Sequence, residues 1–240
     1  MVIGLAFPIM TLMALHILTM EMILIMKYMR PEQILWADFQ IILGHATDVF
    51  VYSQAVANDI LKFHPSSKAR IHILPYCPIP KDEWLIDDLN LEKTYNISKP
   101  YFIICNQFWI HKDHTTALKA FFEFKKINGS THHLVLTGKT TDYRFPEYFR
   151  DLENLINNLD IKDDVKILGH IPKLDQIALL KNSVCVIQPT LFEGGPGGGI
   201  AYEALALDVP IMLSKIDVNL ELENNANLEY FEPQNQLELA

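Results

Sequence analysis

Short apolar runs alternate with amphipathic stretches over most of this chain. The runs are apolar along nearly their whole length, which predicts strands that are buried on both faces. They lie at Asp48–Tyr52, Ile71–Leu74, Tyr101–Asn106, His133–Thr137, Val165–Leu168, Val184–Gln188, Pro210–Leu213 and Leu228–Phe231. Between them, the pattern predicts helices at Gln33–Leu43, Gln54–Phe63, Ala117–Phe124, Leu174–Lys181 and Ile200–Leu207 and within Glu147–Leu159. This alternation predicts an α/β fold in which Tyr101–Phe231 forms a Rossmann-like parallel sheet of at least five strands, covered by helices on both faces.

A change in composition divides the chain into domains. Prolines lie at both ends of a run of acidic residues between Tyr76 and Pro100, which is typical of a linker with one short helix. We therefore expect a partial α/β domain at residues 31–80, a linker at residues 81–99 and a second domain at residues 100–240.

The first 30 residues differ from the rest of the chain. Seven of the eight methionines lie there, and residues 2–20 contain no charged side chain apart from His16 when protonated. An apolar run of this length is a candidate membrane-spanning helix, and Lys27 with Arg30 after it would keep the remainder cytoplasmic, at the inner face of a membrane. The same composition fits a helix buried in a larger domain, or an artificial start where a longer gene was interrupted. The sequence therefore leaves three interpretations of residues 1–29 open: an anchor for membrane association, a buried helix or an artificial start.

Overall composition restricts the function classes. Half of the 240 residues are apolar, which is enough for a sizeable core. The net charge is −9 and basic residues are not concentrated in one stretch, so nucleic acid is not an expected partner. Cys77, Cys105 and Cys185 are scattered and lack metal-ligand spacing, which favours a reduced, cytoplasmic setting.

Glycines follow the run Val184–Gln188, in the sequence FEGGPGGGIAYEALALDVPI. A helix that begins straight after glycines presents unpaired backbone N–H groups and the positive end of its dipole, and both attract phosphate. Glu193 and Glu203 flank this turn, and carboxylates accept hydrogen bonds from hydroxyls. A glycine run alone is more often an ordinary surface loop, but this one follows a buried strand, where ligands of open α/β sheets bind. Together these features indicate a sugar nucleotide.

The sequence FEGGPGGGIAYEALALDVPI resembles the glutamate-rich loop of family 4 glycosyltransferases, which have the GT-B fold. The resemblance implies that Glu193 contacts the transferred sugar and that Glu203 binds the nucleotide ribose. The loop amides would face the sugar and the diphosphate. These amides belong to Gly194, Gly195, Gly197, Gly198 and Gly199. The two glutamates are ten positions apart, against eight in the usual pattern, so the loop is longer here.

Other loops of the second domain share the resemblance. In the family, a lysine between the first strand and helix of this domain reaches the donor diphosphate, and Lys112 in NQFWIHKD has this place. Gln107 stands where an arginine is usual, so part of the expected positive charge is missing. The stretch GHIP resembles the loop beside the nucleotide base, which assigns His170 and Ile171 to that contact.

The amino-terminal part resembles the family less closely. The order of elements from Ala46 to Cys77 is similar to the end of the acceptor-side domain, in which Ser53 would cap a helix. By this resemblance, residues 31–80 are a remnant of that domain. The helices that usually follow the strand Leu228–Phe231 in the donor domain are absent.

Two motifs of other nucleotide enzymes are missing where they would be expected. No DxD sequence is present to hold a divalent cation, and no GK[ST] follows the glycines. The resemblance implies retaining, metal-independent transfer of a hexose, such as mannose or glucose, from a nucleoside diphosphate sugar to a glycan or lipid acceptor, without a cofactor. Lys112 and oriented amides would stabilise the charge of the leaving diphosphate. The alternative is a truncated, non-catalytic nucleotide-sugar-binding module, because most of the acceptor-side domain is not identifiable in residues 1–45.

Overall fold

The computed structural model describes residues 39–76, 79–86, 90–98, 100–129, 131–222 and 227–240. These residues belong to two compact units. The first takes the residues before Val51 together with Asp59–His72, and the second takes Val51–Asn58 together with Ile73–Ala240. The apolar segment at residues 1–30, for which a membrane helix is one interpretation, lies outside the described residues. The expected division at residues 31–80, 81–99 and 100–240 stays a prediction.

The segment from residue 39 to residue 73 contains the elements that its pattern predicts. Residues 39–45 are helical and are followed by β1 (Asp48–Val51), α3 (Gln54–Phe63) and β2 (Arg70–Ile73). Strands β1 and β2 form a two-stranded sheet. The Ser53 hydroxyl accepts a hydrogen bond from the Val56 amide at 3.2 Å, which is the N-cap contact expected of it.

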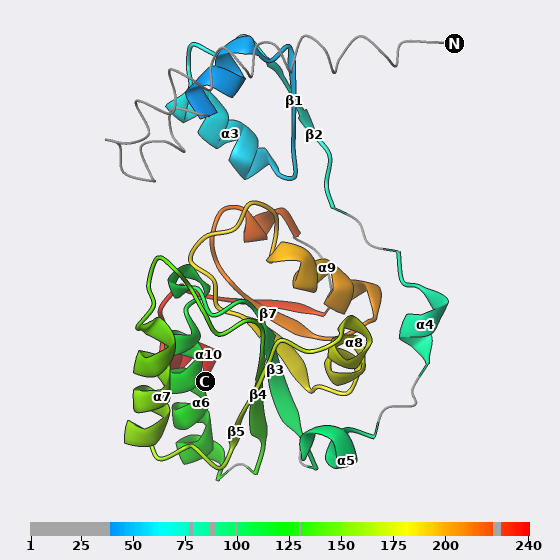
Figure 1. The fold of residues 1–240 in the computed structure, drawn as a ribbon, viewed down its shortest axis with the longest axis vertical. Helices are drawn as coiled ribbons and strands as arrows, with labels where there is room; N and C mark the ends of the chain where they lie inside the picture. Colours follow the sequence, from blue (N-terminus) through cyan, green and yellow to red (C-terminus); the bar gives the residue numbers. More distant parts are fainter. Residues whose placement is uncertain (1–38, 77–78, 87–89, 99, 130, 223–226) are drawn as a thin grey trace. The chain divides into compact units, whose positions relative to one another are not determined.

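The second unit is built on a parallel sheet of six strands, which confirms the predicted fold class (Figure 1). Its strands are β3 (Tyr101–Cys105), β4 (His133–Thr137), β5 (Val165–Gly169), β6 (Cys185–Gln188), β7 (Ile211–Ser214) and β8 (Leu228–Phe231). Their order across the sheet is β5-β4-β3-β6-β7-β8. The central strands are buried on both faces because their sequences are largely apolar at consecutive positions, as in Cys185–Gln188 and His133–Thr137.

Helices cover both faces of this sheet (Figure 1). One face packs against α6 (His114–Asn128), α7 (Tyr148–Asn158) and α10 (Gln236–Leu239). The other packs against α8 (Lys173–Lys181) and α9 (Gly198–Ala206). The alternation of side chains along β3 assigns Ile104 to the first core and Ile103 to the second, and both are fully buried.

The stretch expected to be a linker with one short helix contains two. They are α4 (Asp82–Leu85) and α5 (Leu91–Tyr95), and both belong to the second unit. Trp84 of α4 is buried, and the Lys181 ammonium at the end of α8 donates hydrogen bonds to the carbonyls of Leu85 and Ile86. The Tyr95 hydroxyl donates to the Asp175 carboxylate. This stretch therefore contacts α8 through Tyr95 and through the backbone carbonyls of Leu85 and Ile86, in addition to connecting the elements on either side.

Candidate active site

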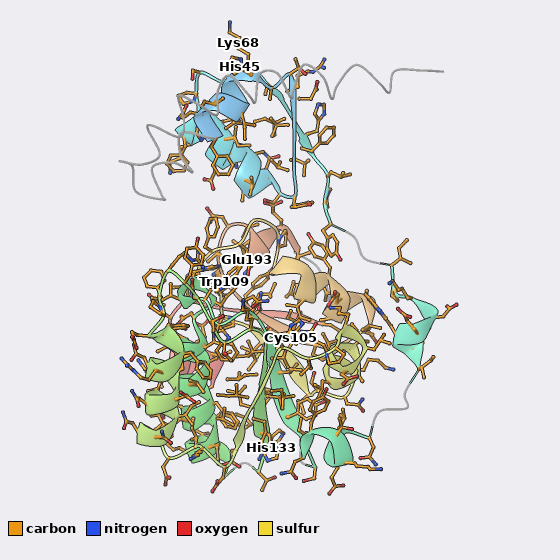
Figure 2. The ribbon with its side chains drawn as sticks, viewed as in Figure 1. His45, Lys68, Cys105, Trp109, His133 and Glu193 are labelled. Carbon is orange, nitrogen blue, oxygen red and sulfur yellow. The ribbon has the colours of Figure 1, made fainter. Side chains whose placement is uncertain are left out.

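The strand order reverses between β3 and β6. Along the chain, β3, β4 and β5 extend the sheet in one direction, whereas β6, β7 and β8 extend it in the other. The loops that leave β3 and β6 therefore diverge, and they leave a crevice at the carboxyl edge, which is where open α/β sheets bind ligands. Figure 2 shows Cys105, Trp109 and Glu193 near this end of the sheet and His133 at the opposite end.

Lys112 and Glu193 meet at this reversal point. Lys112 ends the short helix η1 (Ile110–Lys112) after β3, and Glu193 lies in the loop after β6. The Lys112 ammonium donates a hydrogen bond to Glu193 Oε1, and the two side chains are only 11% and 10% exposed. The loops after β3 and β6 therefore bring both residues to the carboxyl edge of the sheet.

Gln188, the last residue of β6, positions the side chain of Glu193 through a hydrogen bond. Its side-chain nitrogen donates to Glu193 Oε1 at 3.2 Å and to the Gly197 carbonyl at 2.7 Å. Its side-chain oxygen accepts from Asn106 Nδ2 at 2.6 Å. All three bonds fix the orientation of a buried amide, so the carboxylate of Glu193 is held by both strands that flank the crevice.

The glycine loop continues directly into α9. The helix begins at Gly198, two residues earlier than predicted, so Gly198 and Gly199 belong to its first turn. Gly197 has φ 58° and Gly198 has φ 63°, in the left-handed region where glycine is favoured. The Gly197 amide donates to Asn219 Oδ1 at 2.7 Å. The Gly198 amide donates to the Gly195 carbonyl at 3.0 Å, so both of these amides have partners within the protein, while the backbone of Gly198 lies beside Glu193.

The five predicted glycines do not lie equally close to the acidic side chain. A Cβ on Gly198 would lie 3.4 Å from Glu193 Oε2, so this backbone borders the carboxylate directly. Gly197 contacts Gln188 through its carbonyl. Gly194 is exposed with open space around its Cα, and Gly195 and Gly199 are part of the same loop and first turn. Gly197 and Gly198 are thus the two that the structure brings to Glu193.

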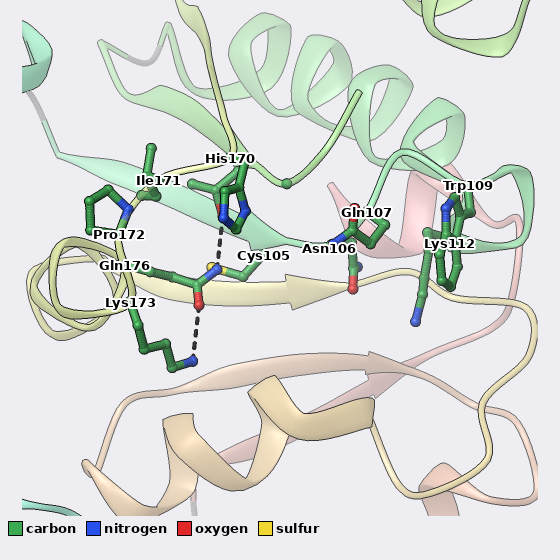
Figure 3. A pocket seen from close by; sticks show the side chains of 12 residues that line it. Cys105, Asn106, Gln107, Trp109, Lys112, His170, Ile171, Pro172, Lys173 and Gln176 are labelled. Atoms are coloured by element: carbon green, nitrogen blue, oxygen red, sulfur yellow. Dashed lines mark hydrogen bonds between the residues drawn. The ribbon is translucent and has the colours of Figure 1, made fainter. Parts of the chain in front are cut away.

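A pocket of about 460 Å³ lies at the carboxyl ends of β3, β4 and β5 (Figure 3). Four of the residues assigned to the nucleotide by sequence line it: Gln107, Lys112, His170 and Ile171. Figure 3 shows Lys112 at one end of the pocket and Lys173 at the other. Trp109, Asn106 and Gln176, which the sequence did not single out, complete the polar and aromatic lining.

Gln107, which stands where an arginine is usual in the resembled family, bonds to the protein backbone. Its side-chain oxygen accepts from the Lys139 amide at 3.1 Å, so it ties the loop after β3 to the loop after β4. Gly138, at the end of β4, allows this close approach, because a Cβ there would lie 1.9 Å from the Asn106 carbonyl oxygen. The neutral Gln107 therefore lines the pocket but adds no charge to it.

Glu203 does not line this pocket itself but is bonded to Lys173, which does. It is buried on α9, and its Oε2 accepts a hydrogen bond from the Lys173 ammonium at 2.5 Å. Lys173 is the first residue of α8 and lines the pocket. Sequence reasoning missed it, although its position directly after the GHIP loop, at the end of β5, placed it on the same edge as the predicted site.

Burial decides the protonation of two neighbouring groups. Burial raises the pKa of the Cys105 thiol to about 12, so this pocket-lining cysteine is protonated at neutral pH and is not a thiolate nucleophile. Burial, with the charge of Lys112, lowers the pKa of His111 from its ordinary value.

Two kinds of feature do not occur in the described parts of the chain. None of the described residues forms a group of three or more histidine, cysteine, aspartate or glutamate side chains that could hold a metal ion. Among the helices described, none has the length and apolar character needed to cross a membrane.

Several solved structures share the fold. The Anabaena protein HepE, in complex with UDP-glucose, matches with a TM-score of 0.71 and 16% identity, over 88% of this chain and 57% of that one. A glycosyltransferase from Rickettsia africae matches with a TM-score of 0.67 and 20% identity, over 85% of this chain and 54% of that one. Sucrose-phosphate synthase from Thermosynechococcus elongatus matches with a TM-score of 0.68 and 20% identity, over 88% and 51%. This chain thus spans about half the length of these proteins.

A family model assigns the sequence as well. The comparison with curated protein sequences gives no match. The model of glycosyl transferases group 1 matches residues 89–240, which is more than half of the chain and includes the whole six-stranded sheet, the pocket, Lys112 and Glu193. With the fold and the site in agreement with that match, the chain belongs to the group 1 glycosyl transferases.

Proposed function

We propose that this chain binds a nucleoside diphosphate sugar at the carboxyl edge of its six-stranded sheet and transfers the hexose to a glycan or lipid acceptor. The observation that carries the proposal is the meeting of Lys112 and Glu193 beside the N-terminus of α9. A cation and a helix N-terminus suit a diphosphate, and a carboxylate next to them suits the hydroxyls of the attached sugar.

Donor binding would replace the ion pair between these two residues. Lys112 would turn from Glu193 to a phosphate oxygen, while Glu193 would accept hydrogen bonds from the sugar. Lys112 would then stay paired with an opposite charge and Glu193 would stay hydrogen-bonded, which matters because both side chains are almost fully buried. As the bond to the leaving diphosphate breaks, Lys112 and the positive end of the α9 dipole would stabilise the developing charge.

The nucleoside would occupy the 460 Å³ pocket. Its base would lie against His170 and Ile171, and its ribose would reach toward Glu203 on α9. The binding of UDP-glucose by the structurally similar HepE supports a nucleotide sugar as the donor. Glucose and mannose are the hexoses that we propose, and the resemblance to family 4 favours retention of configuration without a metal ion or cofactor. We place the reaction in the cytoplasm, at the inner face of a membrane if residues 1–29 act as an anchor.

Calorimetry on the full chain tests this proposal. UDP, GDP and ADP are titrated first, followed by UDP-glucose and GDP-mannose. We expect one of the nucleoside diphosphates to bind, and we expect the matching nucleotide sugar to bind with higher affinity. Failure of all five ligands to bind at millimolar concentration would contradict the proposal.

This chain covers only part of the length of the similar structures, and this observation favours a second function. The chain covers 51–57% of the proteins compared above, and a GT-B enzyme performs its chemistry between two domains. The alternative is accordingly a nucleotide-sugar-binding module without catalytic activity. Incubation with the bound nucleotide sugar distinguishes the two, because an active chain releases nucleoside diphosphate by slow hydrolysis or transfer, whereas a binding module does not.

A further inference from the structure

The ion pair between Lys173 and Glu203 joins the pocket to α9. Lys173 Nζ donates to Glu203 Oε2 at 2.5 Å and to Gln176 Oε1 at 3.0 Å. Gln176 Nε2 in turn donates to Thr137 Oγ1 at 3.2 Å, at the end of β4 (Figure 3). These bonds form a chain from the sheet, through the first turn of α8, to the carboxylate of Glu203.

The two partners differ in exposure. The Glu203 side chain is only 9% exposed, whereas the Lys173 side chain is 48% exposed at the pocket wall. A carboxylate buried to this degree needs a cation or several hydrogen-bond donors. The Lys173 ammonium donates to Oε2 of this carboxylate. A carboxylate has about four acceptor sites, so Lys173 and ribose hydroxyls can share it.

We propose that Lys173 is a positioning residue that holds Glu203 for the ribose and thereby makes the pocket selective for ribonucleotides over deoxyribonucleotides. This inference rests on the proposed function, because it requires a nucleoside diphosphate in the pocket. Lys173 fixes one carboxylate oxygen and compensates the charge, so that the other oxygen faces the ribose hydroxyls in one orientation. A flexible or uncompensated Glu203 would distinguish a hydroxyl from a hydrogen atom less well.

The test compares Lys173→Met with Lys173→Arg in the full-length chain. Calorimetry measures the dissociation constants of UDP, GDP and ADP and of their 2′-deoxy analogues. For the nucleotide that binds most tightly, we expect the wild type to prefer the ribose form by about tenfold, as for one hydrogen bond to a charged group. Lys173→Met should reduce this ratio to about threefold or less, and Lys173→Arg should restore it, since arginine keeps the positive charge and the donor.

A matched control separates positioning from loss of a surface charge. Lys126 is 56% exposed and pairs with Glu123 at 2.8 Å on α6, outside the residues that line the pocket. Lys126→Met removes the same charge and should leave the ratio unchanged. If Lys173→Met lowers the melting temperature strongly, Lys173→Gln is the second test variant. It keeps a polar side chain but lacks the charge that compensates Glu203, so the ratio should fall again.

The outcomes separate this inference from the proposed function. A preserved ribose preference in Lys173→Met and Lys173→Gln, or tighter ribonucleotide binding in them, overturns the positioning role, because Lys173 would then be a spectator or a competitor for Glu203. Equal binding of ribose and deoxyribose forms by the wild type also overturns it but leaves donor binding intact. Only a wild type that binds none of the nucleotides refutes the proposed function together with the inference.

Discussion

Lys112 and Glu193 are 81 positions apart in the sequence, yet their side chains form a buried ion pair at the point where the strand order reverses. Their meeting follows from topology, because β3 and β6 are neighbours in the sheet and each residue lies in the loop after one of these strands. The roles proposed for the two residues differ, so substitutions should separate them.

Replacement of Lys112 by alanine should weaken the binding of the free nucleoside diphosphate and of the intact donor by similar amounts. The reason is that Lys112 would contact only the diphosphate, which both ligands share. We expect a loss of about 1 to 3 kcal/mol in each binding free energy, as for a charge-assisted hydrogen bond. Titration calorimetry measures both values, with Lys126→Ala as the control. A loss confined to the intact donor would contradict a diphosphate contact.

Replacement of Glu193 by glutamine should weaken the binding of the intact donor but not that of the free nucleoside diphosphate. The substitution keeps the shape and the contact with Gln188 but removes the charge that accepts hydrogen bonds from sugar hydroxyls. Free nucleoside diphosphate should bind with nearly unchanged affinity, whereas the donor should bind more weakly and turn over more slowly. Equal weakening of both ligands would show that Glu193 does not recognise the sugar.

Gly197→Ala should destabilise the fold, whereas Gly194→Ala should not. At Gly197 a Cβ would lie 2.3 Å from the Ala201 Cβ, and φ is 58°, so the substitution introduces both a clash and backbone strain. We expect a loss of about 2 to 4 kcal/mol in the free energy of unfolding. At Gly194, in the same loop, a Cβ would meet no other atom within 4 Å. Urea denaturation of both variants checks the difference, and a stable Gly197→Ala variant would argue against the described start of α9.

Stability should fall in mildly acidic solution because of His114. This ring is fully buried and stacks on Phe108 with centroids 4.5 Å apart. Burial, with the nearby charge of Lys112, lowers the pKa of His114 from 6.5 to about 3. Between these values the unfolded state binds a proton that the folded state does not, so stability decreases as the pH falls below 6.5. The decrease should be about 1.4 kcal/mol per pH unit from this group.

The variant His114→Phe isolates that contribution. Phenylalanine preserves the stacking on Phe108 and cannot be protonated. Urea denaturation at about pH 7 and about pH 5 should therefore show a smaller loss in the variant than in the wild type, by about 2 kcal/mol. An identical pH dependence in both proteins would mean that His114 is not the group responsible.

The sheet was predictable from the sequence because the residue pattern of each strand indicates a buried strand without reference to its neighbours. The runs at Tyr101–Asn106 and Val184–Gln188 are apolar at consecutive positions, and the structure makes them the central strands β3 and β6. Because strands of a parallel sheet end at one edge, Lys112 and Glu193 could be assigned to the same edge from the sequence alone. The start of α9 was placed two residues late, because glycines were interpreted as turn residues rather than as its first turn.

The polar contacts of the site were not predictable in the same way. Lys173 begins a helix, like many solvated lysines, and its pairing with Glu203 depends on how α8 and α9 lie side by side on the sheet. Gln188 and Asn106 resemble ordinary strand ends, and their bond across β3 and β6 joins residues 82 positions apart. A pattern along the chain describes each element but not the distance between side chains on different elements.

The strand order also has a consequence for how the chain reaches its fold. Strand β3 pairs with β4 through residues such as Tyr101 and His133, but its other edge pairs with β6, where Phe102 lies opposite Cys185, 83 positions later. During synthesis, one edge of the apolar strand β3 therefore stays unpaired until the ribosome has released residues beyond Gln188. Pairings over such separations slow folding, and an apolar strand with unpaired backbone N–H and C=O groups is prone to aggregate, so chaperone-assisted refolding should recover more of this protein than dilution from denaturant.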